Sequence, residues 1–234
     1  MNIYKHLLFS SILAASSSLV SADSNIKANY QSFIAKNWKV LTKAQGDLNH
    51  DHLADLALII EDTDPKNIVS NDHLGSSKLN LNPRKLLILF KNNNGYQLIA
   101  TNTSLPSEGD IDSPCLADPL GENDPLEIKN GLVKIALHYW LSCGSWYVTN
   151  HTYTFRYQNQ VFKLIGYDND DFHRASGAIT EQSINFLTGK VKNTSGGNEF
   201  AEGNQPIDIK WSKLKKAYSL RLEQVKFNEY YEFE

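Results

Sequence analysis

Four oxygen-bearing side chains are spaced through residues 46–60, the stretch GDLNHDHLADLALII, at intervals that suit a metal ion. Asp47, Asn49 and Asp51 alternate along the chain, and Asp55 follows four residues after the last of them. Calcium takes about six to eight oxygen ligands from carboxylates, amides and backbone carbonyls. We therefore expect these four side chains, with the backbone carbonyl of Leu53, to bind one calcium ion that has a structural role.

The loop does not fit an EF-hand, which needs an acidic ligand at its twelfth position and a helix after it. That position is Leu58, and the residues LALII that follow Asp55 are typical of a buried strand. An Asx-rich turn that binds no ion is the simplest alternative, because Asp and Asn side chains readily bond to nearby backbone groups.

The stretch GDLNHDHLADLALI resembles the calcium loop of FG-GAP repeats, the strand–loop–strand units of integrin-like β-propellers. This resemblance implies ligand roles for the same residues, which are Asp47, Asn49, Asp51, Leu53 and Asp55. It departs from the family pattern at His50 and His52, where that pattern has glycines. The rest of the chain resembles small exported bacterial proteins, a resemblance that implies no activity.

The histidines of the loop suggest a second metal chemistry. His50, His52 and Asp55 resemble part of a zinc hydrolase motif, but the Asp is one position late and no His follows it. A catalytic zinc site needs three protein ligands and an open position. A further ligand would have to come from a remote histidine, for which the candidates are His73, His138, His151 and His173.

A cluster of titratable residues in YDNDDFHR is the other candidate for catalysis. Paired carboxylates beside a histidine can act in acid–base chemistry. The residues concerned are Asp168, Asp170, Asp171, His173 and Arg174. Such a cluster is more often the solvated end of a hairpin, so we treat a metal-dependent or acid–base hydrolase as the alternative function.

The N-terminus predicts export. Residues 1–22 combine one Lys, an apolar stretch too short to span a bilayer, and a final VSA that suits signal peptidase. Cleavage would leave a single all-β domain at 23–234, in the periplasm or secreted, with no later membrane span. The chain has a formal net charge of −3, which argues against a nucleic-acid-binding surface.

Period-two patterns predict an antiparallel all-β fold. LVKIALHYW, WYVTNHTYTFRY and PIDIKW alternate apolar and polar residues, and short Asn/Gly turns at 92–95, 130–131, 158–160 and 188–189 indicate hairpins. We expect a meander of roughly ten to twelve strands, propeller-like or a sandwich. A short N-terminal helix is expected because Ile26, Tyr30, Phe33 and Ile34 share a helical face that Ser24 or Asn25 can cap.

Two further features indicate a binding role. Cys115 and Cys143 are the only cysteines, so an exported chain is expected to join them in a disulfide. The loop 103–125 holds six acidic residues and no Lys or Arg. Aromatic residues are frequent in the segment 139–157, and their rings can stack on a sugar or a peptide. They are Tyr139, Trp140, Trp146, Tyr147, Tyr153, Phe155 and Tyr157. We therefore expect a non-catalytic module that binds a protein or a glycan partner.

Overall fold

The computed structural model describes residues 26–121, 124–203, 205–229, 231 and 233, and these residues form an all-β fold. The predicted signal peptide at 1–22 and the predicted helix caps Ser24 and Asn25 lie outside the described residues. Within the described part, fourteen strands pair antiparallel and helices are limited to short 3-10 turns. No helix in this part of the chain is long and apolar enough to cross a membrane.

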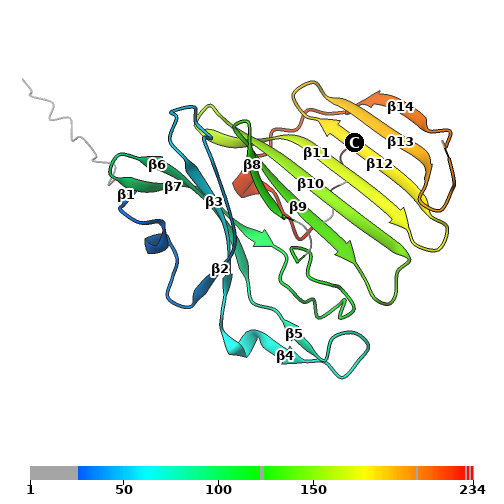
Figure 1. Cartoon of the computed structure of the whole chain (residues 1–234), viewed down its shortest axis with the longest axis horizontal. Helices are drawn as coiled ribbons and strands as arrows, with labels where there is room; N and C mark the ends of the chain where they lie inside the picture. Colours follow the sequence, from blue (N-terminus) through cyan, green and yellow to red (C-terminus); the bar gives the residue numbers. More distant parts are fainter. Residues whose placement is uncertain (1–25, 122–123, 204, 230, 232, 234) are drawn as a thin grey trace, which may run out of the picture.

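The first sheet has five strands (Figure 1). In spatial order they are β1 (Ile26–Lys27), β7 (Gly95–Leu105), β6 (Arg84–Asn92), β3 (Asp55–Asp62) and β2 (Trp38–Gly46). The central strands β3 and β6 are buried on both faces, which explains their continuous apolar runs. A separate two-stranded sheet of β4 (Ile68–Ser70) and β5 (Lys78–Asn80) follows the 3-10 turn η2 (Pro65–Asn67).

The N-terminal segment covers the outer face of this first sheet. The expected helix is a single 3-10 turn, η1 (Tyr30–Phe33), which Asn29 caps by accepting from the backbone N–H of Gln31. Ile26 is not helical, because it pairs with β7 as part of β1. Side chains of η1 and its flanks pack on the second apolar face of β3 and β6.

The second sheet has seven strands and extends away from the first (Figure 1). In spatial order they are β14 (Asp208–Lys213), β13 (Lys190–Asn198), β12 (Ala178–Asn185), β11 (Val161–His173), β10 (Tyr147–Gln158), β9 (Leu132–Trp140) and β8 (Leu126–Lys129). The predicted hairpin turns occur between β6 and β7, β8 and β9, β10 and β11, and β12 and β13. Asn130, Asn159 and Gln160 take positive φ in these turns, as tight hairpin loops require.

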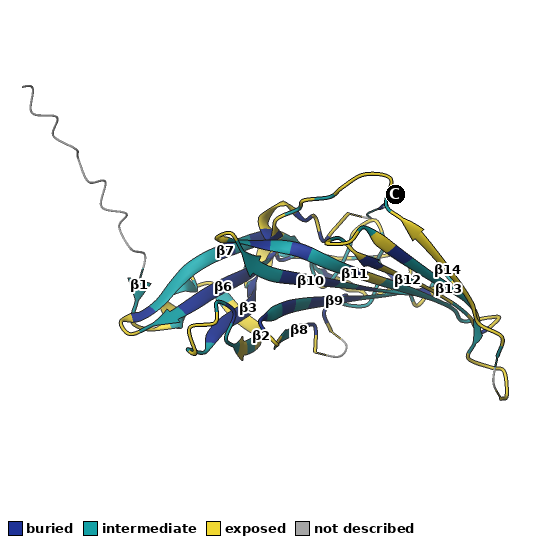
Figure 2. Cartoon of the chain, turned by 90° about the horizontal axis from the view of Figure 1, so that it is seen from above, coloured by how far each residue is buried: buried dark blue, intermediate teal, exposed yellow. Residues whose placement is uncertain are grey.

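One main core lies between the two sheets. Of the two predicted arrangements, propeller-like or sandwich, the fold has the sandwich-like one. One face of the second sheet, here called the inner face, carries Val133, Tyr153, Phe155 and Tyr167 into this core. The alternation in PIDIKW is wrong as a sign of burial, because every residue of β14 is exposed (Figure 2). β14 is an edge strand, and its apolar residues Ile209 and Trp211 have no covering layer among the described residues.

The C-terminal segment connects the two sheets. It contains the 3-10 turn η3 (Leu222–Gln224), and the backbone of Leu220 accepts from Leu164 of β11. The side chain of Asn102 in β7 donates to the carbonyls of Leu222 and Val225, each at 2.7 Å. The segment thereby closes the core over strands from both sheets.

Candidate functional site

The predicted calcium loop lies between β2 and β3 and is organised by its own acidic side chains. The Asp47 carboxylate accepts from the backbone N–H groups of His50 at 2.7 Å, Asp51 at 3.2 Å and His52 at 2.9 Å. Desolvation raises the pKa of Asp47, but these backbone hydrogen bonds outweigh it and hold the pKa below the usual range. Asp51 accepts from the backbone of Leu53 and from the Asn49 amide.

The two histidines in this loop adopt the backbone conformation that favours glycine. φ is 64° at His50 and 67° at His52, in the left-handed region. The FG-GAP pattern has glycines at both positions, and glycine adopts this region readily. His is among the side chains that tolerate this region better than β-branched residues do.

Asp55 serves as a structural anchor of the loop. Its side chain is fully buried, and its two oxygens accept from the backbone N–H groups of Leu48 and Lys91, each at 2.8 Å. Burial raises the pKa of Asp55, against the two hydrogen bonds that lower it. The residue therefore joins the loop to the β6–β7 hairpin. Among the described residues, no three His, Cys, Asp or Glu side chains are placed to hold a metal ion.

The remote histidines do not join His50 and His52 around Asp55. His73 lies in the loop between β4 and β5, whereas His138, His151 and His173 belong to three strands of the second sheet. The His52 side chain is 96% exposed and points away from the core. His138 and His151 also face opposite sides of their sheet, since His138 pairs with Asn150 and His151 with Leu137.

The predicted cluster at 168–174 is divided by the strand that carries it. Residues 161–173 form β11, so Asp168 and Asp170 point to the outer face while Asp171 and His173 point to the inner face. Asp170 accepts from the Asn150 amide at 2.7 Å. The carboxylates of this stretch therefore do not gather into one acid–base site.

Three adjoining pockets on the inner face share Asp171, and we call them the Asp171 pockets. Their volumes are about 290, 280 and 300 Å³. The aromatic pocket is lined by Tyr139, Thr149, His151, Tyr153, Asp171, Phe227, Asn228 and Glu229. The amide pocket is lined by Tyr167, Asn169, Asp171, Thr180, Glu181, Gln182, Asn193, Thr194, Ser195 and Tyr231. The third is lined by Tyr147, Asp171, His173, Ser176, Ala178 and Thr180.

Sheet register explains why these polar side chains meet. Asn169 pairs with Gln182, and Gln182 pairs with Asn193, so the three amides cross three strands as one row. Asp171 accepts from Thr149 Oγ1 at 2.6 Å and from Asn169 Nδ2 at 3.2 Å. The sheet continues beyond the core here, and polar side chains replace apolar ones on the same face.

Aromatic residues form the part of the site that adjoins the core. His151 is 7% exposed, and its Nδ1 lies 2.7 Å from Tyr167 Oη. Burial lowers the pKa of His151, although the charges of Asp171 and Asp170 act in the opposite direction. Burial, with the nearby charge of Asp110, raises the pKa of Tyr139 to about 12, so its hydroxyl stays protonated.

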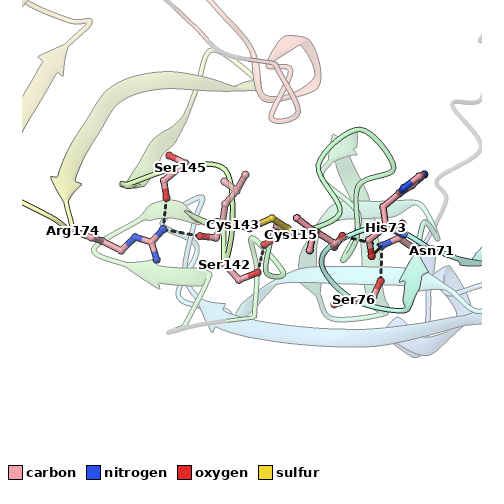
Figure 3. The surroundings of a disulfide bond; sticks show 10 residues. Asn71, His73, Ser76, Cys115, Ser142, Cys143, Ser145 and Arg174 are labelled. Atoms are coloured by element: carbon pink, nitrogen blue, oxygen red, sulfur yellow. Dashed lines mark hydrogen bonds between the residues drawn. A yellow bond between two sulfur atoms is a disulfide. The ribbon is translucent and has the colours of Figure 1, made fainter.

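The acidic loop predicted at 103–125 begins after β7, at residue 106, and its described residues, 106–121 and 124–125, reach the same region, where the predicted disulfide holds the loop. Cys115 and Cys143 are bonded with a Cα–Cα distance of 5.5 Å, which confirms the pairing (Figure 3). Ser142 donates from its backbone and its hydroxyl to the Cys115 carbonyl. A further pocket of about 320 Å³ lies between this loop and Tyr139. The acidic loop and the aromatic face, both predicted as partner surfaces, therefore adjoin at Tyr139.

No protein-family model, curated protein or solved structure matches this chain. The FG-GAP resemblance therefore stays a prediction about one loop.

Several members of the site were not identified from the sequence. They are Thr149, Asn169, Gln182, Asn193 and Phe227. The alternation within β10 and β11 offered a signal for two of them, because Thr149 and Asn169 fall on the same face as the core residues Tyr153 and Tyr167. No sequence pattern indicated Phe227, since it lies in an irregular segment.

Proposed function

We propose that this chain is an exported, non-catalytic binding protein that holds a glycan on the inner face of its second sheet. The observation that carries the proposal is the convergence of three pockets on Asp171, with amides on one side and aromatic rings on the other. Amide, hydroxyl and carboxylate groups suit the hydroxyls of a sugar. Aromatic rings offer the apolar surface on which a sugar ring stacks.

Several features support export and a binding role without chemistry. The disulfide suits an oxidising compartment, as the predicted signal peptide does. The carboxylates of the 168–174 stretch point to two faces, and Asp171 is held by Thr149 and Asn169. This arrangement suits a fixed recognition group better than an acid–base pair that exchanges protons with a substrate.

Calorimetric titration with neutral and charged oligosaccharides tests this function. We expect saturable binding to the intact chain, and a loss of at least about tenfold in affinity for Gln182→Ala, which removes the central amide of the row. Asn150→Ala on the outer face is the matched control, and it should bind as the unchanged chain does. Absence of binding to every oligosaccharide, or release of sugar products on incubation, would contradict the proposal.

We also propose that the 47–55 loop binds one structural calcium ion. Asp47, Asn49, Asp51 and the carbonyl of Leu53 would hold it, and the left-handed backbone at the two loop histidines supports the expected loop shape. Asp55 fits a ligand role less well, because its side chain is fully buried and links the backbone of Leu48 to that of Lys91 in β6. An ion there would stabilise the fold by mass action.

Thermal unfolding with calcium or with a chelator tests the ion. We expect calcium to raise the melting temperature of the intact chain and of the control Asp72→Ala, which alters an exposed Asp in another loop. The Asp51→Ala variant should not respond to calcium. Equal melting temperatures with calcium and with chelator in the intact chain would exclude a structural ion.

A further inference from the structure

The charge around the Asp171 pockets has one sign. Asp171 lies where the three pockets meet, and Glu229 lines the aromatic pocket. Glu181 also borders the amide pocket, but it pairs with Asp170, so its carboxylate points to the outer face. Among the described residues that line these pockets there is no Lys or Arg. Such a site repels an anionic ligand and attracts a positive charge.

The aromatic pocket offers a second attraction for a cation. Tyr139, Tyr153 and Phe227 line it, and Tyr139 is the one of these three whose side chain is partly exposed. The face of an aromatic ring attracts an ammonium group. His151 does not compete as a cation at neutral pH, because burial lowers its pKa from an ordinary value of 6.5. Asp171 lines this pocket too, so a carboxylate and aromatic rings act on the same volume.

The amide pocket fits the remaining part of such a ligand. Gln182 donates to Asn193 at 3.0 Å, which fixes the amides side by side on neighbouring strands. Amides both donate and accept, as the hydroxyls of a sugar do. A ligand that spans the two pockets therefore meets a carboxylate at their junction and neutral polar groups beyond it.

We propose that the ligand at Asp171 is a cationic amino sugar, whose ammonium group lies between the Asp171 carboxylate and the rings of the aromatic pocket. This inference rests on the proposed glycan-binding function and names the chemical class of the ligand. The Asp171 carboxylate and the Tyr139 ring favour a positively charged ligand, while the amide row binds its hydroxyl groups.

Two probes of equal length separate the contribution of charge from that of the sugar. They are the glucosamine tetramer, which carries ammonium groups at mildly acidic pH, and the N-acetylglucosamine tetramer, which carries none. By calorimetric titration at low salt we expect the intact chain to bind the first at least about tenfold more tightly. Comparable affinity for both probes, or tighter binding of the neutral one, would overturn the inference.

Three variants locate the charge effect. Asp171→Asn should remove most of the preference for the glucosamine tetramer and change affinity for the neutral tetramer by less than about threefold. Glu229→Gln, at an exposed position beside the aromatic pocket, should reduce the preference by a smaller factor without altering a strand. Asp168→Asn is the matched control, because it removes a carboxylate from the outer face of the same strand.

The results distinguish this inference from the function on which it rests. If both tetramers bind equally and Gln182→Ala weakens both, the glycan-binding function is supported and the amino-sugar inference fails. If neither tetramer nor any other oligosaccharide binds, both fail. If Asp171→Asn unfolds, a preserved charge preference in Glu229→Gln contradicts the inference, and a reduced one supports it.

Discussion

Arg84 is the largest fully buried side chain among the described residues, and it is a charged one. Its Nε donates to Glu61 Oε2 at 2.7 Å, and its two terminal nitrogens bind the Asp118 carboxylate at 2.5 and 2.7 Å. Glu61 also receives Lys39 Nζ at 2.8 Å. This network joins β3 and β6 to the acidic loop between β7 and β8, so one residue positions a loop that lines the pocket beside Tyr139.

Removal of Arg84 should leave two carboxylates without their buried partner. We expect Arg84→Met to lower the free energy of unfolding by roughly 3–5 kcal/mol, because Glu61 is then buried with its charge only partly compensated. Urea denaturation measures the change. Lys210→Met breaks the exposed pair with Asp208 and should change the stability far less, which makes it the control. Equal effects of the two substitutions would refute the role of burial.

Glu61 should make stability depend on pH in the acidic range. Burial raises its pKa, but Lys39 and Arg84 outweigh burial and hold the pKa below the ordinary 4.5. An acid whose pKa is lowered on folding stabilises the protein fully above its unfolded pKa, and that stabilisation is lost as the pH falls through the folded pKa.

We therefore expect the stability difference between the unchanged chain and Glu61→Gln to be constant near neutral pH and to shrink below pH 4.5. Urea denaturation at a series of pH values measures this difference. A difference that stays constant down to strongly acidic pH would show that Glu61 does not carry the effect.

At the scale of the elements, local patterns in the sequence predicted the strands and turns well. Val133, Ile135 and Leu137 face the core as their alternation indicates, and the Asn/Gly turns form the hairpins. The same alternation divides the 168–174 cluster between the two faces of the sheet, and its last residues lie at the β11–β12 turn, the hairpin end predicted as the alternative. The pattern failed at β14, because periodicity shows which residues share a face but not whether another layer covers that face.

The acidic loop is the element whose position depends most on a covalent link. The disulfide joins residues 28 apart, and the backbone of Leu116 pairs with that of Leu141 beside it. We expect the double variant Cys115→Ser/Cys143→Ser to lose about 3–4 kcal/mol in the free energy of unfolding, from the added freedom of the unfolded chain. Denaturant unfolding of the intact chain under reducing conditions should give the same value. A clear disagreement between the reduced chain and the double variant would mean that the serines cause damage of their own.

At the scale of the whole molecule, the pairing of distant segments decides both the core and the site. The packing of the C-terminal segment on β7 brings together residues more than 100 positions apart, and no local sequence pattern predicts such a contact. The burial of Arg84 and the meeting of the three pockets at Asp171 depend on the same long-range arrangement. The sequence therefore predicted the fold class and the disulfide, but not the place where the site forms.

Phe227 is the point at which the C-terminal segment contributes to core and site together. It is 1% exposed, its ring centroid lies 5.0 Å from that of Tyr153, and it lines the aromatic pocket. Phe227→Ala should lower the free energy of unfolding by roughly 3–5 kcal/mol through the cavity it leaves. Phe227→Leu should cost much less stability, yet it should weaken binding of the glucosamine tetramer because it removes the ring that packs against Tyr153 in the lining of the pocket. Phe200→Ala, at a position that is 61% exposed, is the control for both measurements. If Phe227→Leu binds as tightly as the unchanged chain, the segment closes the core without taking part in recognition.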